Sequence, residues 1–123
     1  PGVHTVLMNR LGRGPALDVQ VLVDRAHHQR RTCPYQADRL QDLLARRATV
    51  KLGSGVGENG VMHLKIVAVD NRVVYLGSAN VTLASLSNRE AVVRIVGGSI
   101  IQEILAATQA AFADAMPLES IRS

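Results

Sequence analysis

The chain has 123 residues, a formal net charge of +4 and 47% apolar side chains, but only two tyrosines, one phenylalanine and no tryptophan. This length fits one domain, expected over residues 1–123, and the few aromatic residues argue against a module that reads bases by stacking. The single cysteine, Cys33, excludes an intramolecular disulfide and a cysteine-based zinc site. No apolar run reaches the ~20 residues of a membrane helix and no signal peptide is visible, so we expect no transmembrane segment. The single cysteine favours a reducing compartment, and we therefore expect a cytoplasmic protein.

The first third of the chain predicts a helix end, a strand and a basic loop. Residues 3–11 are ambiguous and are interpreted as the end of a helix, which the Gly-Arg-Gly-Pro sequence at 12–15 terminates. Residues 17–23 alternate between apolar and polar side chains and then become fully apolar, as in a buried strand. The polar loop that follows carries candidates for guiding a polyanion, with a plain solvated loop as the alternative: Arg25, His27, His28, Arg30 and Arg31.

A helix, a strand and a glycine-rich loop are predicted next. The helix covers residues 35–47, begins near Pro34 and carries leucines at helical spacing. The strand covers residues 49–52, and the loop covers residues 53–60. This loop lacks the Gly-Lys-Ser/Thr ending of a phosphate-binding loop, so we interpret it as a mobile rim of the site.

A hairpin is predicted in the second half of the chain. Its arms are residues 61–69 and 72–78, joined around Asp70-Asn71. The remaining predicted elements are a short helix or turn, a strand and an Ala-rich helix, at residues 81–88, 90–96 and 99–115. Strands alternating with helices predict an α/β fold with a mixed β-sheet flanked by helices.

Four polar side chains on the hairpin are the candidates for chemistry. Because side chains alternate along a strand, His63 and Lys65 share one face of the first arm, and Ser78 and Asn80 share one face of the second. An imidazole can attack phosphorus, a lysine can neutralise non-bridging oxygens, and hydroxyl and amide groups can donate hydrogen bonds to those oxygens. The set therefore suits a phosphodiester, and without a cluster of metal ligands we expect no metal and no cofactor.

The register of the hairpin decides which of these side chains meet. A two-residue turn sets odd positions of the first arm opposite even positions of the second. With Asp70-Asn71 as the turn, His63 lies opposite Ser78. With Asn71-Arg72 as the turn, His63 lies opposite Asn80. We expect one of these two registers.

The complete spaced set resembles the signature of the phospholipase D superfamily. The resemblance covers roughly residues 17–115, and its specific part runs from His63-x-Lys65 through Asp70 and Gly77-Ser78-x-Asn80 to Ser85, Asn88 and Glu90. It implies that His63 is the nucleophile, or the general acid in a partner copy, and that Glu90 orients His63. It also implies three phosphate ligands, Lys65, Ser78 and Asn80. Asp70 belongs to the motif's catalytic set, and its place at the turn indicates a structural role.

The resemblance also implies a partner. The family's chemistry uses two histidines, and this chain carries one motif, as in short members that complete the site by homodimerisation. Family domains usually begin with two strands and a helix before the strand expected at 17–23, so this half-domain is expected to be truncated at its N-terminal edge. We expect a phosphodiesterase, namely a nuclease; the alternatives are a phospholipid hydrolase or phosphatidyltransferase, and a non-catalytic binding or dimerisation module.

Overall fold

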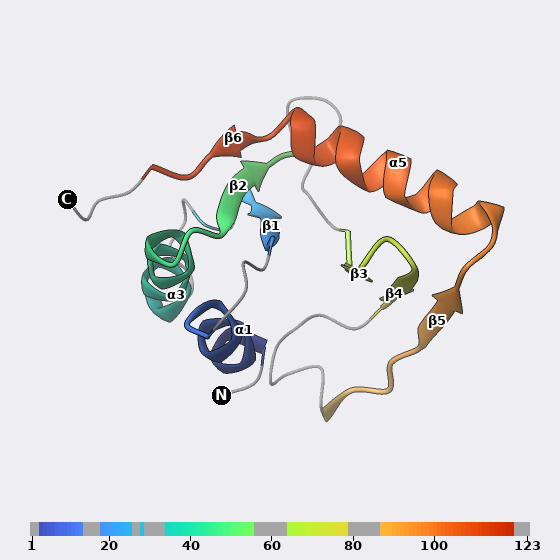
Figure 1. Cartoon of the computed structure of the whole chain (residues 1–123), viewed down its shortest axis with the longest axis horizontal. Helices are drawn as coiled ribbons and strands as arrows, with labels where there is room; N and C mark the ends of the chain where they lie inside the picture. The colour runs from blue at the N-terminus through green and yellow to red at the C-terminus, as the bar shows by residue number, and fades with distance from the viewer. Residues whose placement is uncertain are drawn as a thin grey trace. The chain divides into compact units, whose positions relative to one another are not determined.

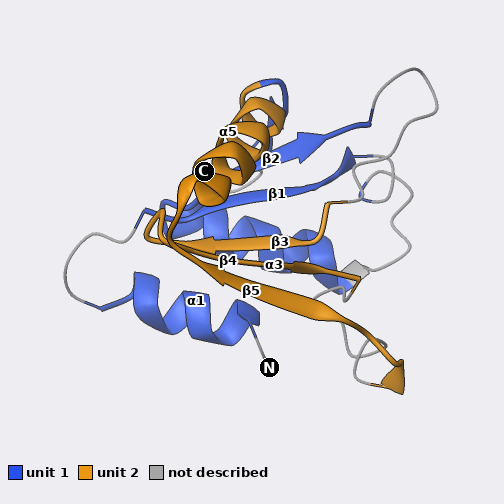
Figure 2. Ribbon diagram, turned by 90° about the vertical axis from the view of Figure 1, so that its right-hand side faces the viewer, with its two compact units in different colours: residues 1–62, 114–123 blue, residues 63–113 orange. Residues whose placement is uncertain are grey.

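The computed structural model describes residues 3–13, 18–25, 28, 34–55, 64–78 and 87–119. The internal contacts divide the chain into two compact units, residues 1–62 with 114–123 and residues 63–113. Each unit has its own three-stranded sheet; Figure 1 labels the elements, and Figure 2 colours the two units. The expected α/β class with mixed strand directions is therefore confirmed, whereas the single domain over residues 1–123 stays a prediction.

The first unit is built around a parallel strand pair joined by a helix. Strand β1 (Gln20–Asp24) runs parallel to β2 (Thr49–Gly53), and α3 (Pro34–Ala45) connects them. The two-residue strand β6 (Met116–Pro117) adds to β2 in the antiparallel sense. The helix expected at 35–47 and the strand expected at 49–52 are confirmed, whereas β1 begins at Gln20 rather than at residue 17 and extends to Asp24, where its pairing with β2 ends.

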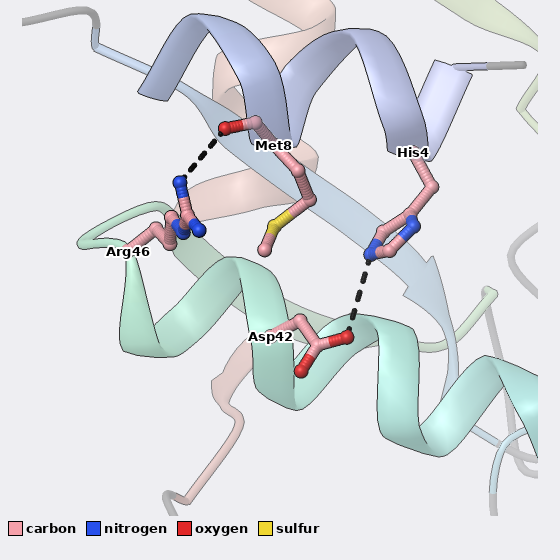
Figure 3. A network of polar contacts seen from close by, with 4 residues as sticks. All are labelled: His4, Met8, Asp42 and Arg46. Carbon is pink, nitrogen blue, oxygen red and sulfur yellow. Dashed lines mark hydrogen bonds and ion pairs between the residues drawn. The ribbon is translucent and has the colours of Figure 1, made fainter. Parts of the chain in front are cut away.

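Helix α1 (Val3–Leu11) covers part of the same core, so the interpretation of residues 3–11 as helical is confirmed. Its partly buried side chains pack with a cluster of buried residues of α3, β2 and the link between them: Leu40, Leu43, Ala48 and Val50. Two polar contacts also join α1 to α3 and to Arg46 directly after it (Figure 3). His4 Nε2 lies 3.7 Å from Asp42 Oδ2, and Arg46 Nη1 donates a hydrogen bond of 3.1 Å to the carbonyl oxygen of Met8.

Helix α3 ends with a hydrogen-bond pattern that normally requires glycine. The Ala48 amide donates to the carbonyl of Leu43 at 3.0 Å, and the Arg47 amide donates to that of Leu44 at 3.0 Å. This is a Schellman motif, in which the residue after the cap adopts left-handed backbone angles. That residue is Arg47, with φ of 69°. A side chain with a Cβ atom is strained there.

Replacing Arg47 by glycine is therefore expected to stabilise the protein by about 1 kcal/mol, because glycine adopts positive φ without the Cβ clash. The urea midpoint measures this change. Arg47→Ala is the matched control: it removes the same charge but keeps the Cβ atom, so it should give no gain. An equal gain in both variants would contradict the backbone explanation.

The second unit is an antiparallel sheet covered by one helix. Strands β3 (Ile66–Val69), β4 (Val73–Gly77) and β5 (Val92–Val96) lie in the order β3-β4-β5, followed by α5 (Ser99–Ala113). The predicted hairpin, the strand at 90–96 and the final helix are therefore confirmed with shorter bounds. The core forms where β4 meets α5, around three buried residues: Val74, Ile101 and Leu105.

The hairpin register differs from both expected registers. The Arg72 amide donates to the Val69 carbonyl at 3.1 Å, and Asp70 and Asn71 have φ of 55° and 54°, so these two residues do form the tight turn. The strand ladder, however, pairs Val69 with Val73 and Ile66 with Leu76. Three residues thus separate the paired strands. Even-numbered residues of β3 therefore pair with even-numbered residues of β4, and odd-numbered residues with odd-numbered ones.

The extra residue in the loop changes which side chains lie opposite each other, so both expected registers, which set His63 opposite Ser78 or opposite Asn80, are wrong. A regular continuation of the observed register would set Ser78 opposite Leu64 rather than opposite His63. The paired strands also stop at Ile66 and Gly77, so Lys65 and Ser78 lie just outside them. Strand alternation therefore does not place Ser78 beside His63.

Candidate functional site

The described part of the second unit contains four of the expected site residues: Lys65, Asp70, Ser78 and Glu90. His63 and Asn80, the expected nucleophile and amide ligand, lie outside the described residues, as does Ser85. The same holds for three residues of the basic loop: His27, Arg30 and Arg31. Their expected roles stay predictions.

Gly77, the last residue of β4, allows β4 and β5 to approach closely. It pairs with Val92 at the start of β5. A Cβ atom built on Gly77 would overlap the carbonyl oxygen of Ala91 and would lie 2.8 Å from the Cα atom of Val92. Both are backbone atoms, so neither can rotate away. The glycine of the Gly77-Ser78 pair therefore has a steric role that the sequence analysis did not identify.

Ser78 follows directly and binds the residue before β5 through two hydrogen bonds. The Ser78 amide donates to the carbonyl of Ala91 at 3.0 Å, and the Ala91 amide donates to the Ser78 Oγ atom at 3.0 Å. In a regular antiparallel pair both acceptors are backbone carbonyls. Here the serine side chain replaces its own carbonyl as one acceptor, so its position is tied to the backbone of Ala91.

The Ser78 hydroxyl donates its hydrogen to Glu90. The Ser78 Oγ and Glu90 Oε2 atoms are 2.5 Å apart, and Asn88 Nδ2 donates to Glu90 Oε1 at 3.3 Å. Each oxygen of this half-buried carboxylate thus accepts one side-chain hydrogen bond. The sequence analysis placed these three residues in one motif but did not predict that they bind one another. A serine directly after a glycine at a strand end is the signal that could have suggested the contact.

Lys65 and Asp70 lie at opposite ends of β3. Lys65 is half-buried and directly precedes the strand, whereas Asp70 is exposed in the turn that follows it. The positive φ of Asp70 fits the structural role expected for it, because aspartate tolerates left-handed backbone angles better than most residues.

Two residues of the basic loop are described in the first unit. Arg25 is exposed, and its Nη1 atom lies 3.3 Å from the sulfur atom of Met116 in β6. His28 is half-buried. Both follow the carboxyl end of β1, as the sequence predicted. Their expected role in guiding a polyanion stays a prediction.

The described residues show neither a metal-ligand cluster nor a membrane-spanning helix. Over the described ranges, no three side chains of His, Cys, Asp or Glu gather as metal ligands. Within the same part of the chain, no helix has the length and apolar character needed to cross a membrane.

Most of the chain matches one protein-family model. The family model for the cardiolipin synthase, PLD-like domain matches residues 5–111. No curated protein matches the sequence significantly.

Two solved structures share the fold. Nuc from Salmonella typhimurium, a phospholipase D family member, superimposes with a TM-score of 0.75 at 21% identity, over 96% of this chain and 74% of Nuc. NucT from Helicobacter pylori superimposes with a TM-score of 0.55 at 14% identity, over 93% of this chain and 89% of NucT. At these identities the likeness concerns the fold.

Proposed function

This chain belongs to the phospholipase D superfamily as a PLD-like domain, and from that premise we propose that it is a metal-independent phosphodiesterase, a nuclease that cleaves DNA or RNA through a covalent phosphohistidine. The observation that carries the proposal is the complete motif from His63 to Glu90, whose carboxylate is held by Ser78 and Asn88. A carboxylate held by two donors is suited to orienting a nucleophilic imidazole.

The proposed reaction needs two imidazoles. His63 attacks the phosphorus atom, the bond to the leaving oxygen breaks, and a second, protonated imidazole gives its proton to that oxygen. Water then attacks the phosphorus atom of the phosphohistidine and gives a proton to the second imidazole. The phosphorus–nitrogen bond breaks, and His63 is released. Because the chain has one motif, we assign the second imidazole to His63 of a partner copy in a homodimer.

The charge on the phosphate must be stabilised by protein groups. Lys65 supplies a positive charge, and Asn80 supplies hydrogen-bond donors to the non-bridging oxygens. Arg25 and His28 are assigned a weaker, long-range role in attracting a polyanion, in keeping with the net charge of +4. The single cysteine favours a reducing compartment, so we place the protein in the cytoplasm.

A phospholipid-directed activity is the second candidate. The matching family model describes a cardiolipin synthase domain, and the same histidine chemistry would transfer or hydrolyse a phosphatidyl group. Exposed apolar side chains on β3 and β5 offer surface for contact with lipid: Val67, Val69, Val92 and Val96. The two candidates differ in substrate and not in mechanism.

Cleavage in the presence of EDTA tests the proposal and separates the candidates. DNA, RNA and vesicles of phosphatidyl lipids are each incubated with the protein, with and without EDTA. We expect nucleic acid to be cleaved at a rate that EDTA leaves unchanged within about twofold, because the protein itself neutralises the phosphate. Loss of cleavage in EDTA that Mg²⁺ restores would contradict metal independence.

Salt provides the second readout of the same experiment. If three basic side chains each neutralise one phosphate, the affinity for double-stranded DNA should fall about 40-fold between roughly 50 and 200 mM salt. Cleavage of phosphatidyl lipid alone would favour the second candidate, and inactivity on all three substrates would favour a non-catalytic module.

A further inference from the structure

We infer that Ser78 is a positioning residue that, together with Asn88, fixes the Glu90 carboxylate, and that it does not act as a phosphate ligand. The inference rests on the proposed function, in which Glu90 orients His63. It changes the role that the family resemblance implied for Ser78. The hydrogen bonds of the second unit carry the argument.

The hydrogen of the Ser78 hydroxyl is already used. A serine hydroxyl has one hydrogen to donate and two lone pairs that accept. The hydrogen goes to Glu90 Oε2 across 2.5 Å, and one lone pair accepts the Ala91 amide at 3.0 Å. To donate to a phosphate oxygen, the hydroxyl would have to give up its charge-assisted bond to the carboxylate, and the anionic phosphate offers only a bond of the same class in exchange.

The carboxylate keeps room for a third donor. Glu90 accepts one hydrogen bond on each oxygen, from Asn88 on Oε1 and from Ser78 on Oε2. An ionised carboxylate offers about four lone-pair positions, so an imidazole N–H can still bind. Two donors on different oxygens fix the plane of the carboxylate, and a fixed plane defines the direction from which that imidazole N–H must approach.

The chain around the carboxylate also restrains the serine. Ser78 is tied to Ala91 by hydrogen bonds in both directions, and Ala91 is the residue next to Glu90. Gly77 lets the two strands come close enough for these bonds to form. The geometry therefore couples the end of β4 to the carboxylate of Glu90, two residues before β5.

A double-mutant cycle on activity tests the inference. We expect Ser78→Ala and Asn88→Ala each to lower kcat about tenfold, with KM changed less than about twofold, because a misdirected imidazole slows chemistry rather than binding. In a Glu90→Ala background, Ser78→Ala should have no further effect, since its target is gone. Ser78→Thr, which keeps the hydroxyl, should restore most of kcat. Ser87→Ala, which removes an exposed serine hydroxyl beside Asn88, is the control and should leave kcat unchanged.

Two outcomes would overturn the positioning role while leaving the proposed function intact. One is that Ser78→Ala lowers kcat by the same factor with and without Glu90. The other is that Ser78→Ala raises KM alone. Either result would make Ser78 a direct phosphate ligand.

A second cycle does not depend on activity. The urea midpoint of the double variant should be lowered by less than the sum of the losses in Ser78→Ala and Glu90→Ala, because both single changes break the same Ser78–Glu90 hydrogen bond. Additive losses would overturn the Ser78–Glu90 bond itself. A wild-type protein that cleaves no phosphodiester, but shows this non-additive stability, would overturn the proposed function and with it the catalytic use of the bond.

Discussion

The His63→Ala variant is expected to lose at least about 10⁴-fold in kcat, because removal of a nucleophile eliminates the covalent route and leaves only binding and electrostatic stabilisation. Binding of nucleic acid should persist, since Lys65 and the basic loop remain. A cleavage assay in EDTA and a filter-binding assay measure the two effects separately. His4→Ala is the matched control: His4 lies on α1 next to Asp42, in the first unit, and its loss should leave kcat unchanged. Equal activity of wild type and His63→Ala would refute histidine catalysis.

The same variant tests the two-subunit site. If each site uses His63 from both copies, a mixed dimer has only one His63 side chain in its site and is inactive. Equal co-expression of wild-type and His63→Ala chains should then give about one quarter of the wild-type activity per chain, because only dimers with two wild-type copies work. A value of about one half would mean that each chain carries a complete site.

The Gly77→Ala variant is expected to lose about 2–3 kcal/mol of stability, in the upper range for overpacking, because the new methyl group meets backbone atoms that cannot rotate away. The methyl group would overlap the carbonyl oxygen of Ala91 and approach the Cα atom of Val92. The end of β4 must then move away from β5, and the bonds between Ser78 and Ala91 must stretch or break. Activity should fall by at least about tenfold under conditions where the variant is still folded, since the carboxylate of Glu90 loses one of its two donors.

Gly97→Ala separates this steric effect from the general cost of replacing glycine. Gly97 has φ of 66°, and a Cβ atom there would meet nothing within 4 Å. Its replacement should cost about 1 kcal/mol through backbone strain alone and leave kcat unchanged. Urea unfolding and cleavage assays on both variants give the comparison. If Gly77→Ala were as stable and as active as Gly97→Ala, the close approach of β4 and β5 would matter neither for stability nor for activity.

Most of the fold could be predicted because its signals are local. The helical spacing of leucines predicted α3, and the break at Gly97-Gly98 separated β5 from α5. Strand β6 has two residues and exists only because β2 offers it an edge, so no periodic pattern could predict it. Strand β1 was placed three residues too early because its start depends on pairing with β2 rather than on its own alternation.

The site was harder to predict because its contacts depend on register. The turn residues Asp70 and Asn71 were identified correctly, but one extra residue before Val73 changed the parity of the ladder. A sequence pattern cannot reveal such a shift, because either parity leaves apolar side chains on both arms. The bond from Ser78 to Glu90 joins residues twelve positions apart that meet only after β4 and β5 pair.

Trapping of the covalent intermediate is the most direct test of the account. Wild-type protein is incubated briefly with a phosphodiester that is radiolabelled at the scissile phosphate, quenched in alkali to preserve phosphohistidine, and digested for peptide mapping. The account predicts label on the peptide that contains His63 in the wild type and no label in His63→Ala. Label on a different residue, or equal label in both proteins, would contradict the claim that His63 forms the bond to phosphorus.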